Sequence, residues 1–463
     1  MKKRILLILG CAFCFFPNRV LFADVDIQNK PTHYIFLIHG IGGTRKHFGH
    51  MEEALTRALN KHDPTTTYLV KSIEYDTGND EKMPYDFARD INQEIESVIS
   101  LGNLKTRDEF SLIMHSQGGL VGSIWIFQSL QSTPGFASPE LIKHLDAFIT
   151  LGTPFWGAKV ARWGSEVKDI THQWKLDLKV PFGKQELEQM TFGSDMIFDF
   201  RISMIDPEYE KYIDYLKHHV RFLNIVGVAD VLNPLGVFVS GTQQYEDDGA
   251  VPISSGRFNF LYTQSIKNSY EEGDVVTLKN MRSVEMAPHL VVKGVHKSPF
   301  PQIKHLGDLP QTPSDCLHNE DCDDPTFPHI WRHILREKLK KDNVPENFRS
   351  FLLDVNVRLP ETESDQCRDI NIEIRQLNGD LLEDAKIKLS KFYEFYSEGM
   401  YASQKYPGHC RFYFTGSIES PGRNRKEALL LKFSAPGFKS RDVQVQLRGS
   451  YSSFVDINLE TNE

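Results

Sequence analysis

The stretch Phe110–Gly122, FSLIMHSQGGLVG, decides the fold of this chain. Its apolar run Phe110–Met114 is typical of a buried strand, and beyond Ser116 it continues into a segment able to begin a helix. A serine at such a tight strand-to-helix turn stands above the sheet edge, where its hydroxyl can attack a substrate. Gly118 supplies the glycine that the turn requires two residues later, whereas Met114 replaces the usual small residue. We therefore predict Ser116 as a nucleophile; the alternative is a structural serine in an ordinary turn.

Two other apolar runs end in similar glycine-containing turns. Tyr34–Ile38 leads into His39–Gly43, and Phe148–Leu151 leads into Gly152–Pro154. In chain order, the strings HGIGG, HSQGG, TLGTPFWG and DDGAVP resemble the α/β-hydrolase fold, in particular its bacterial lipases and esterases. The resemblance covers about residues 30–340 and implies an α/β fold with a mostly parallel sheet and a helical lid.

A serine nucleophile needs a histidine to take its proton and a carboxylate to orient that histidine. In the fold that the strings resemble, the order along the chain is serine, acid, histidine. His296 follows the apolar run Leu290–Val295, the predicted last strand of the sheet, and is the predicted base. His305 and His329 are the alternatives.

The predicted catalytic acid is Asp248, because its string DGAVP resembles the stretch that carries the acid in bacterial lipases. Its neighbour Asp247 would face elsewhere. Asp230 stays an alternative, since it comes shortly after the predicted strand Phe222–Val228.

An oxyanion forms when serine attacks an ester, and two backbone N–H groups usually stabilise it. The resemblance implies that these are the N–H groups of Gln117, directly after the nucleophile, and Ile41, in the HGIGG loop. His39 would then brace the loop and take no part in the chemistry.

The first 23 residues have the features of a secretory signal. Lys2, Lys3 and Arg4 precede the apolar run Ile5–Phe16, which is too short to span a bilayer, and Leu21–Ala23 offers a cleavage site before Asp24. We therefore expect export to the periplasm or the extracellular space. The net charge of −9 argues against a general nucleic-acid binder.

Four cysteines remain after the signal segment is removed. An even number in an exported chain suggests disulfides, and we favour the two local pairs Cys316–Cys322 and Cys367–Cys410. The spacing does not resemble a zinc site. We predict no cofactor and no metal; calcium at the acidic cluster Glu320–Asp324 is the alternative to a solvated loop.

Helical periodicity separates the predicted strands. It predicts helices over Met51–Asn60, Tyr85–Leu101 and Ile330–Lys341, and a further strand over Tyr68–Tyr75. Alternation of strands with helices indicates a parallel sheet covered on both faces.

Residues 155–220 contain no strand signal and form the predicted lid. Helices are expected over Ser194–Ile202 and Glu208–Lys217, and Trp156, Trp163 and Trp174 also fall in this range. Such aromatic content favours an apolar substrate, although a purely structural cap is the alternative.

Beyond Pro345 the pattern changes from helical to period two. Alternating apolar positions occur at Ile370, Ile372, Ile374, Val443, Val445 and Leu447. The sequence here resembles carboxypeptidase-regulatory or Cna-B modules. We therefore divide the chain into a signal peptide (1–23), a hydrolase domain (24–344) and an independently folding β-sandwich (345–463) that binds a surface, polymer or protein.

Together these features predict an exported serine hydrolase that cleaves esters of apolar acyl groups, with membrane lipid as one candidate substrate. An acyltransferase or thioesterase could use the same site. A non-catalytic binding protein on a hydrolase scaffold is the alternative outside the enzymes.

Overall fold

The computed structural model describes residues 30–100, 102–158, 161, 183–228, 246–263, 265–267, 275–276, 281–296, 306–307, 316, 318–337, 348–360, 367–378, 385–388, 395–403, 405–418 and 426–462. The chain divides into two compact units, Met1–Lys30 and Pro31–Glu463, and every element named below lies in the second. The predicted signal peptide lies outside the described residues. No helix in the described ranges combines the length and apolar character needed to cross a membrane.

A six-stranded sheet carries the predicted site. Its strand order is β10-β5-β4-β3-β1-β2, and every neighbouring pair is parallel. The strands are β1 (Thr32–Ile38), β2 (Thr67–Ile73), β3 (Glu109–His115), β4 (Leu145–Leu151), β5 (Arg221–Val228) and β10 (His289–Lys293). All seven residues of β4, LDAFITL, are buried, as expected for a parallel sheet covered on both faces.

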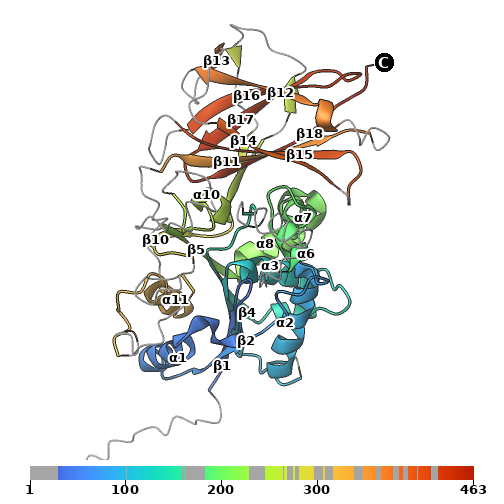
Figure 1. Ribbon diagram of the computed structural model, residues 1–463. Coiled ribbons are helices and arrows are strands. Elements are labelled where there is room, and N and C mark those ends of the chain that lie inside the picture. The colour runs from blue at the N-terminus through green and yellow to red at the C-terminus, as the bar shows by residue number, and fades with distance from the viewer. Residues whose placement is uncertain are drawn as a thin grey trace, which may run out of the picture. The chain divides into compact units, whose positions relative to one another are not determined.

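Helices cover both faces of this sheet (Figure 1). On one face, α1 (Met51–His62) and α11 (Phe327–Ile334) share an apolar cluster with the strands. On the other face, α2 (Pro84–Val98) and α3 (Gln117–Leu130) belong to a second cluster. The other helices of the described ranges are η2 (Arg45–Phe48), α4 (Pro139–Ile142), α6 (Lys184–Gln189), α7 (Asp195–Ile205), η3 (Pro207–Tyr209), α8 (Glu210–His219) and α10 (Ile253–Gly256). This architecture is the predicted α/β-hydrolase fold.

The predicted helices and strands agree with the structure except at some ends. The helix predicted to begin at Ile330 begins at Phe327, because Asp324 accepts hydrogen bonds from the N–H groups of Thr326 (2.9 Å) and Phe327 (2.7 Å). Pro328 also suits a first helical turn. Helices α7 and α8 occupy the two ranges expected for the lid, whereas Trp163 and Trp174 lie outside the described residues.

Two further six-stranded sheets contain the C-terminal strands. Their orders are β14-β15-β11-β18-β6-β9 and β7-β17-β16-β12-β13-β8, and one apolar cluster draws residues from both. The C-terminal strands are β11 (Ser350–Arg358), β12 (Asn371–Asn378), β13 (Ala385–Lys388), β14 (Phe395–Ala402), β15 (His409–Ser417), β16 (Lys426–Ser434), β17 (Arg441–Arg448) and β18 (Ser452–Asn458). The alternating residues Val443, Val445 and Leu447 of β17 are fully buried, but the intervening Asp442, Gln444 and Gln446 are buried as well, so this strand is covered on both faces. The resemblance to carboxypeptidase-regulatory or Cna-B modules stays a prediction.

Four strands of these two sheets come from the middle of the chain. They are β6 (Phe260–Thr263), β7 (Ser265–Lys267), β8 (Val275–Val276) and β9 (Met281–Val284), which lie between β5 and β10 in sequence. β6 pairs with β18, β7 with β17 and β8 with β13. The domain boundary predicted at residue 345 therefore does not separate the sheets, and strands of two to four residues are too short to show a period.

Buried ion pairs join α7 to the sheet β14-β15-β11-β18-β6-β9. Arg201 of α7 pairs with Asp354 of β11, and the two side chains are 1% and 0% exposed. Arg411 of β15 pairs with Asp195 of α7 at 2.9 Å. The carboxylate of Glu246, two residues before the predicted acid, accepts the N–H groups of Arg349 and Ser350 at 2.9 and 2.7 Å. The C-terminal strands are thus built into the hydrolase, in contrast to the independently folding module that we predicted.

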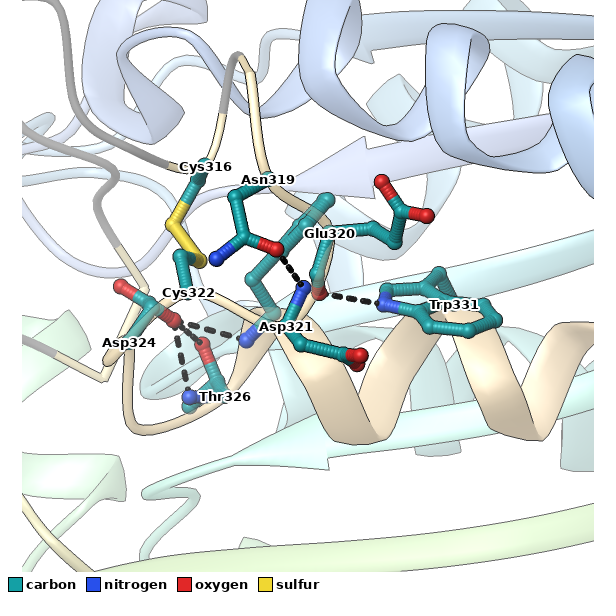
Figure 2. Close-up of a disulfide and its surroundings, with 9 residues drawn as sticks. Cys316, Asn319, Glu320, Asp321, Cys322, Asp324, Thr326 and Trp331 are labelled. Atoms are coloured by element: carbon teal, nitrogen blue, oxygen red, sulfur yellow. Dashed lines mark hydrogen bonds between the residues drawn. A yellow bond between two sulfur atoms is a disulfide. The ribbon is translucent and has the colours of Figure 1, made fainter.

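The two predicted disulfides are present. Cys316 pairs with Cys322 with Cα atoms 4.9 Å apart, and Cys367 pairs with Cys410 at 5.4 Å. The first closes the loop that precedes α11 (Figure 2), and the second links β15 to the segment before β12.

Candidate active site

Ser116 lies between the end of β3 and the first residue of α3, in a strained backbone conformation (φ 54°, ψ −126°). A positive φ is uncommon for any residue except glycine and is typical of a serine presented at a sharp turn. A Cβ atom on Gly118 would lie 2.6 Å from the carbonyl oxygen of Ile38 and 2.5 Å from that of His39. The predicted need for glycine at this position is therefore steric.

The unusual residue in this turn, Met114, is accommodated by a glycine on the following helix. Met114 is fully buried, and its Sδ would lie 2.2 Å from a Cβ atom on Gly122. Gly122 thus leaves the space that the thioether occupies. The sequence shows this glycine but gives no indication of its partner.

The structure brings Ser116, His296 and Asp248 together. His296 Nε2 lies 2.8 Å from Ser116 Oγ, and His296 Nδ1 lies 2.9 Å from Asp248 Oδ2. The backbone N–H of His296 also donates to the carbonyl of Asp248 at 2.8 Å. The other carboxylate oxygen of Asp248 accepts N–H groups from Ala250 (3.0 Å) and Val251 (2.7 Å), so this buried side chain is held at both oxygens.

The alternative acids and bases are placed differently. Asp230 and His305 lie outside the described residues. His329 lies in α11, and burial lowers its pKa. Burial raises the pKa of Asp247 to about 6, partly opposed by the hydrogen bond from the Gly249 N–H, and the charge of the adjacent Asp248 adds to the rise.

Gly152 is a site residue that the sequence analysis did not identify. It has a positive φ of 59°, and a Cβ atom there would lie 2.9 Å from Asp248 Oδ2 and 3.1 Å from His296 Nδ1. Any larger residue would push against the hydrogen bond between these two side chains. Its place in the TLGTP string, at the end of a parallel strand, was the only available signal.

The loop after β1 lies against the predicted nucleophile. A Cβ atom on Gly40 would be 2.6 Å from Ser116 Cβ. Within the described part of the chain, neither the Ile41 N–H nor the Gln117 N–H donates to another protein group. Both predicted oxyanion donors therefore belong to segments that adjoin Ser116, and both are available to a ligand as far as the described residues go.

Tyr75 and His39 support this loop. The Tyr75 hydroxyl lies 2.9 Å from the His39 carbonyl and 2.8 Å from Gln117 Oε1, and its single proton can be donated to either oxygen. The His39 ring stacks on Tyr75 with centroids 4.5 Å apart, and its Nδ1 lies 2.9 Å from the Gly40 carbonyl. Burial, together with the charge of Glu186, holds the pKa of Tyr75 well above its usual value, so the hydroxyl stays protonated. These contacts fit the bracing role predicted for His39.

Three carboxylates of the acidic cluster near Cys322, those of Glu320, Asp321 and Asp324, do not converge on a common centre (Figure 2). Glu320 pairs with Lys61, Asp321 pairs with Arg332, and Asp324 caps α11. A different group, His33 with Glu109 and Asp146, is close enough to hold a metal ion. Two guanidinium groups already neutralise its carboxylates: Arg221 pairs with Asp146, and Arg336 pairs with both Asp146 and Glu109. These pairings argue against a cation at either place.

A protein-family model described as "Putative serine esterase (DUF676)" matches residues 28–180. The matched range contains Ser116 and the loop after β1, and the match supports ester hydrolysis. No curated protein matched the sequence.

Solved structures share the fold. Phospholipase PlaB from Legionella pneumophila is 14% identical, with a TM-score of 0.62 over 93% of this chain and 94% of that chain. Its complex with thio-NAD gives the same identity and coverage with a TM-score of 0.60. A mature lipase, BlEst2 from Bacillus licheniformis, is 17% identical over 50% of this chain and 80% of that chain, but its TM-score of 0.29 is too low to support an argument. The chain is therefore similar to serine esterases over residues 28–180, and it shares its fold, C-terminal strands included, with a bacterial phospholipase.

Proposed function

We propose that this protein is a serine hydrolase that cleaves carboxylic esters of apolar acyl groups, with Ser116 as nucleophile, His296 as base and Asp248 as acid. The observation that carries the proposal is the continuous relay from Ser116 Oγ to His296 Nε2 (2.8 Å) and from His296 Nδ1 to Asp248 Oδ2 (2.9 Å). The esterase family match supports the same reaction class.

In the first half of the reaction Ser116 Oγ attacks the ester carbonyl carbon while His296 Nε2 takes its proton. Asp248 accepts the Nδ1–H of His296 and stabilises the imidazolium that forms. The N–H groups of Ile41 and Gln117 donate to the developing oxyanion. His296 then gives the proton to the departing alcohol as the ester C–O bond breaks, which leaves an acyl-Ser116 ester.

In the second half a water molecule attacks the acyl carbon while His296 Nε2 takes one of its protons. The bond between the acyl carbon and Ser116 Oγ breaks, and the proton passes from His296 to this oxygen. The products are the carboxylic acid and the regenerated serine.

The aromatic content of residues 155–220 supports an apolar acyl group, because large aromatic surfaces favour apolar ligands. Phe155, which follows the TLGTP turn, is fully buried; it stacks on Phe200 of α7 (5.4 Å between centroids) and packs edge-on against Phe258 (4.7 Å), so it holds α7 against the loop after β4. The name phospholipase carried by a protein of the same fold makes phospholipid the first natural substrate to test.

The proposal includes export. Two disulfides suit an oxidising compartment, since the reducing cytosol rarely preserves such bonds. The basic and apolar start of the sequence supports the same location.

The test is an activity panel of p-nitrophenyl esters and phospholipid vesicles with the wild-type protein and Ser116→Ala, together with labelling by a fluorophosphonate. We expect hydrolysis and labelling with the wild type and neither with Ser116→Ala. Absence of both with the wild type would favour the non-catalytic scaffold, and transfer of the acyl group to glycerol in preference to water would favour an acyltransferase. Asp248→Asn and Asp230→Asn, measured separately, test the acid: near wild-type turnover in Asp248→Asn with loss in Asp230→Asn would reverse the assignment.

A further inference from the structure

A second histidine lies against the proposed catalytic base. His115, the last residue of β3, is 2% exposed, and its ring centroid lies 4.7 Å from that of His296 with an interplanar angle of 39°. His115 Nδ1 lies 2.9 Å from Nε2 of His47, and these two rings are stacked at 4.8 Å. Three imidazoles therefore follow one another from η2 to the base.

The ring of His115 has little freedom to move. Its backbone pairs with Leu151 of β4, within the central sheet. A Cβ atom on Gly307 would lie 2.7 Å from His115 Cγ, so this segment packs directly on the ring. The hydrogen bond with His47 fixes the rotation of the ring, with one imidazole donating and the other accepting.

His296 is held in a different way. It follows the end of β10, and its ring is anchored through two hydrogen bonds at its nitrogen atoms, one to Asp248 and one to Ser116. The bond to Ser116 changes during the reaction, because Oγ has no proton to donate once it carries the acyl group. In that intermediate the ring keeps its covalent attachment at Cγ and its hydrogen bond to Asp248, but it loses the restraint at Nε2, the atom that must face the water.

We propose, on the basis of the proposed function, that His115 is a positioning residue that keeps the His296 ring aligned in the acyl-enzyme, and that His47 fixes the orientation of His115. The alignment matters most in the second half-reaction, when His296 Nε2 must face the incoming water and take its proton. A displaced ring would slow this step, since catalytic groups act only within a narrow geometry. The first half-reaction is less sensitive, because Ser116 itself then holds Nε2.

The experiment separates the two half-reactions in the full-length protein with a p-nitrophenyl ester. The first turnover, followed by stopped flow, reports acylation, and the steady-state kcat reports deacylation where a burst is seen. His47→Ala should lower kcat about ten-fold while acylation changes less than about two-fold. His115→Asn should do the same, and so should His115→Phe, which keeps a flat ring but loses the hydrogen bond to His47.

A matched control is His50→Ala. His50 lies three residues after His47, is 34% exposed at its side chain and approaches Glu53 at 3.9 Å. It should leave both steps unchanged. Melting temperatures identify any variant that fails to fold. If the His115 variants do not fold, His47→Ala, at a half-buried position, still tests the inference.

Unchanged kcat in His47→Ala, or an equal fall in acylation and deacylation, would overturn the inference while the proposed function stands. If the wild type shows no burst because acylation limits turnover, a p-nitrophenyl ester of a hindered acyl group such as trimethylacetate, which deacylates slowly, restores the burst. If the wild type is neither acylated nor labelled by the fluorophosphonate at Ser116, the proposed function fails and the inference fails with it.

Discussion

Removal of one partner from the buried pair Arg201–Asp354 should destabilise the whole unit Pro31–Glu463. Both side chains are almost completely buried, so Asp354→Asn leaves a guanidinium without its counter-charge. Burial lowers the pKa of Arg201 to about 10, which still leaves it charged at neutral pH. An unpaired buried charge of this kind costs about 3–5 kcal/mol of unfolding free energy.

The expected change in melting temperature follows from the size of the unit. With an unfolding entropy of about 2 cal/mol/K per residue over roughly 430 residues, the loss corresponds to a fall of about 3–6 °C. Arg201 also lies over the ring of Trp156, 3.5 Å from its centroid, so the loop after β4 should loosen together with α7. We therefore expect Asp354→Asn to lose esterase activity even at temperatures below its melting transition.

The assay is thermal and urea unfolding followed by circular dichroism, with activity measured on the same samples. The double variant Arg201→Met/Asp354→Leu should recover most of the stability, because two apolar side chains leave no buried charge. The exposed pair Lys143–Glu140 provides the control, and Lys143→Met should change the unfolding free energy by less than about 1 kcal/mol. The reasoning is refuted if Asp354→Asn melts within 1 °C of the wild type.

Three further predictions test other parts of the structure. Gly152→Ala should lower kcat about 100-fold by displacing Asp248 and His296, whereas Gly437→Ala, with a similar positive φ and open space around it, should leave kcat unchanged; equal effects would contradict the steric argument. Burial lowers the pKa of His33 to about 4 from 6.5, so its contribution to the unfolding free energy is complete above pH 6.5 and falls by about 2 kcal/mol at pH 5. Urea titrations at pH 7.5 and 5.0 measure this fall, and His33→Phe should reduce it. An unchanged fall in His33→Phe would exclude His33 as its source. A chain ending at Asn343 should be insoluble or inactive, because it lacks the partners of α7 and β6; a soluble, active product would restore the independent module.

The central sheet could be predicted because its strands are buried on both faces. Continuous apolar runs such as those in β3 and β4 stand out in any sequence, and the turns after them carry the glycines and the serine of the site. The proposed base could also be predicted from the sequence, since His296 follows the last parallel strand and the ends of parallel strands meet at one sheet edge.

What could not be predicted depends on contacts between distant segments. Strands β6, β7 and β8 are recognisable only through partners that follow much later in the chain, and β9 only through β6. The space that Gly152 leaves for Asp248 and His296, and the space that Gly122 leaves for Met114, depend on distances that no spacing encodes. The sequence favoured Asp248 over Asp230 as the acid only because the residues that flank Asp248 resemble those of bacterial lipases.

Because the chain crosses between sheets, some strands are synthesised long before the strands that they pair with. When β10 has just left the ribosome, all six strands of the central sheet exist, but the partners of β7 and β8 and one partner of β6 have not yet been made. Those open strand edges persist until β13, β17 and β18 emerge, and unpaired edges favour aggregation. The partner of Arg201 in α7 also follows the central sheet in the chain, because Asp354 belongs to β11. The fold of this hydrolase is therefore complete only when the C-terminal strands have been synthesised. A chain whose synthesis stops before them keeps unpaired strand edges and depends on chaperones.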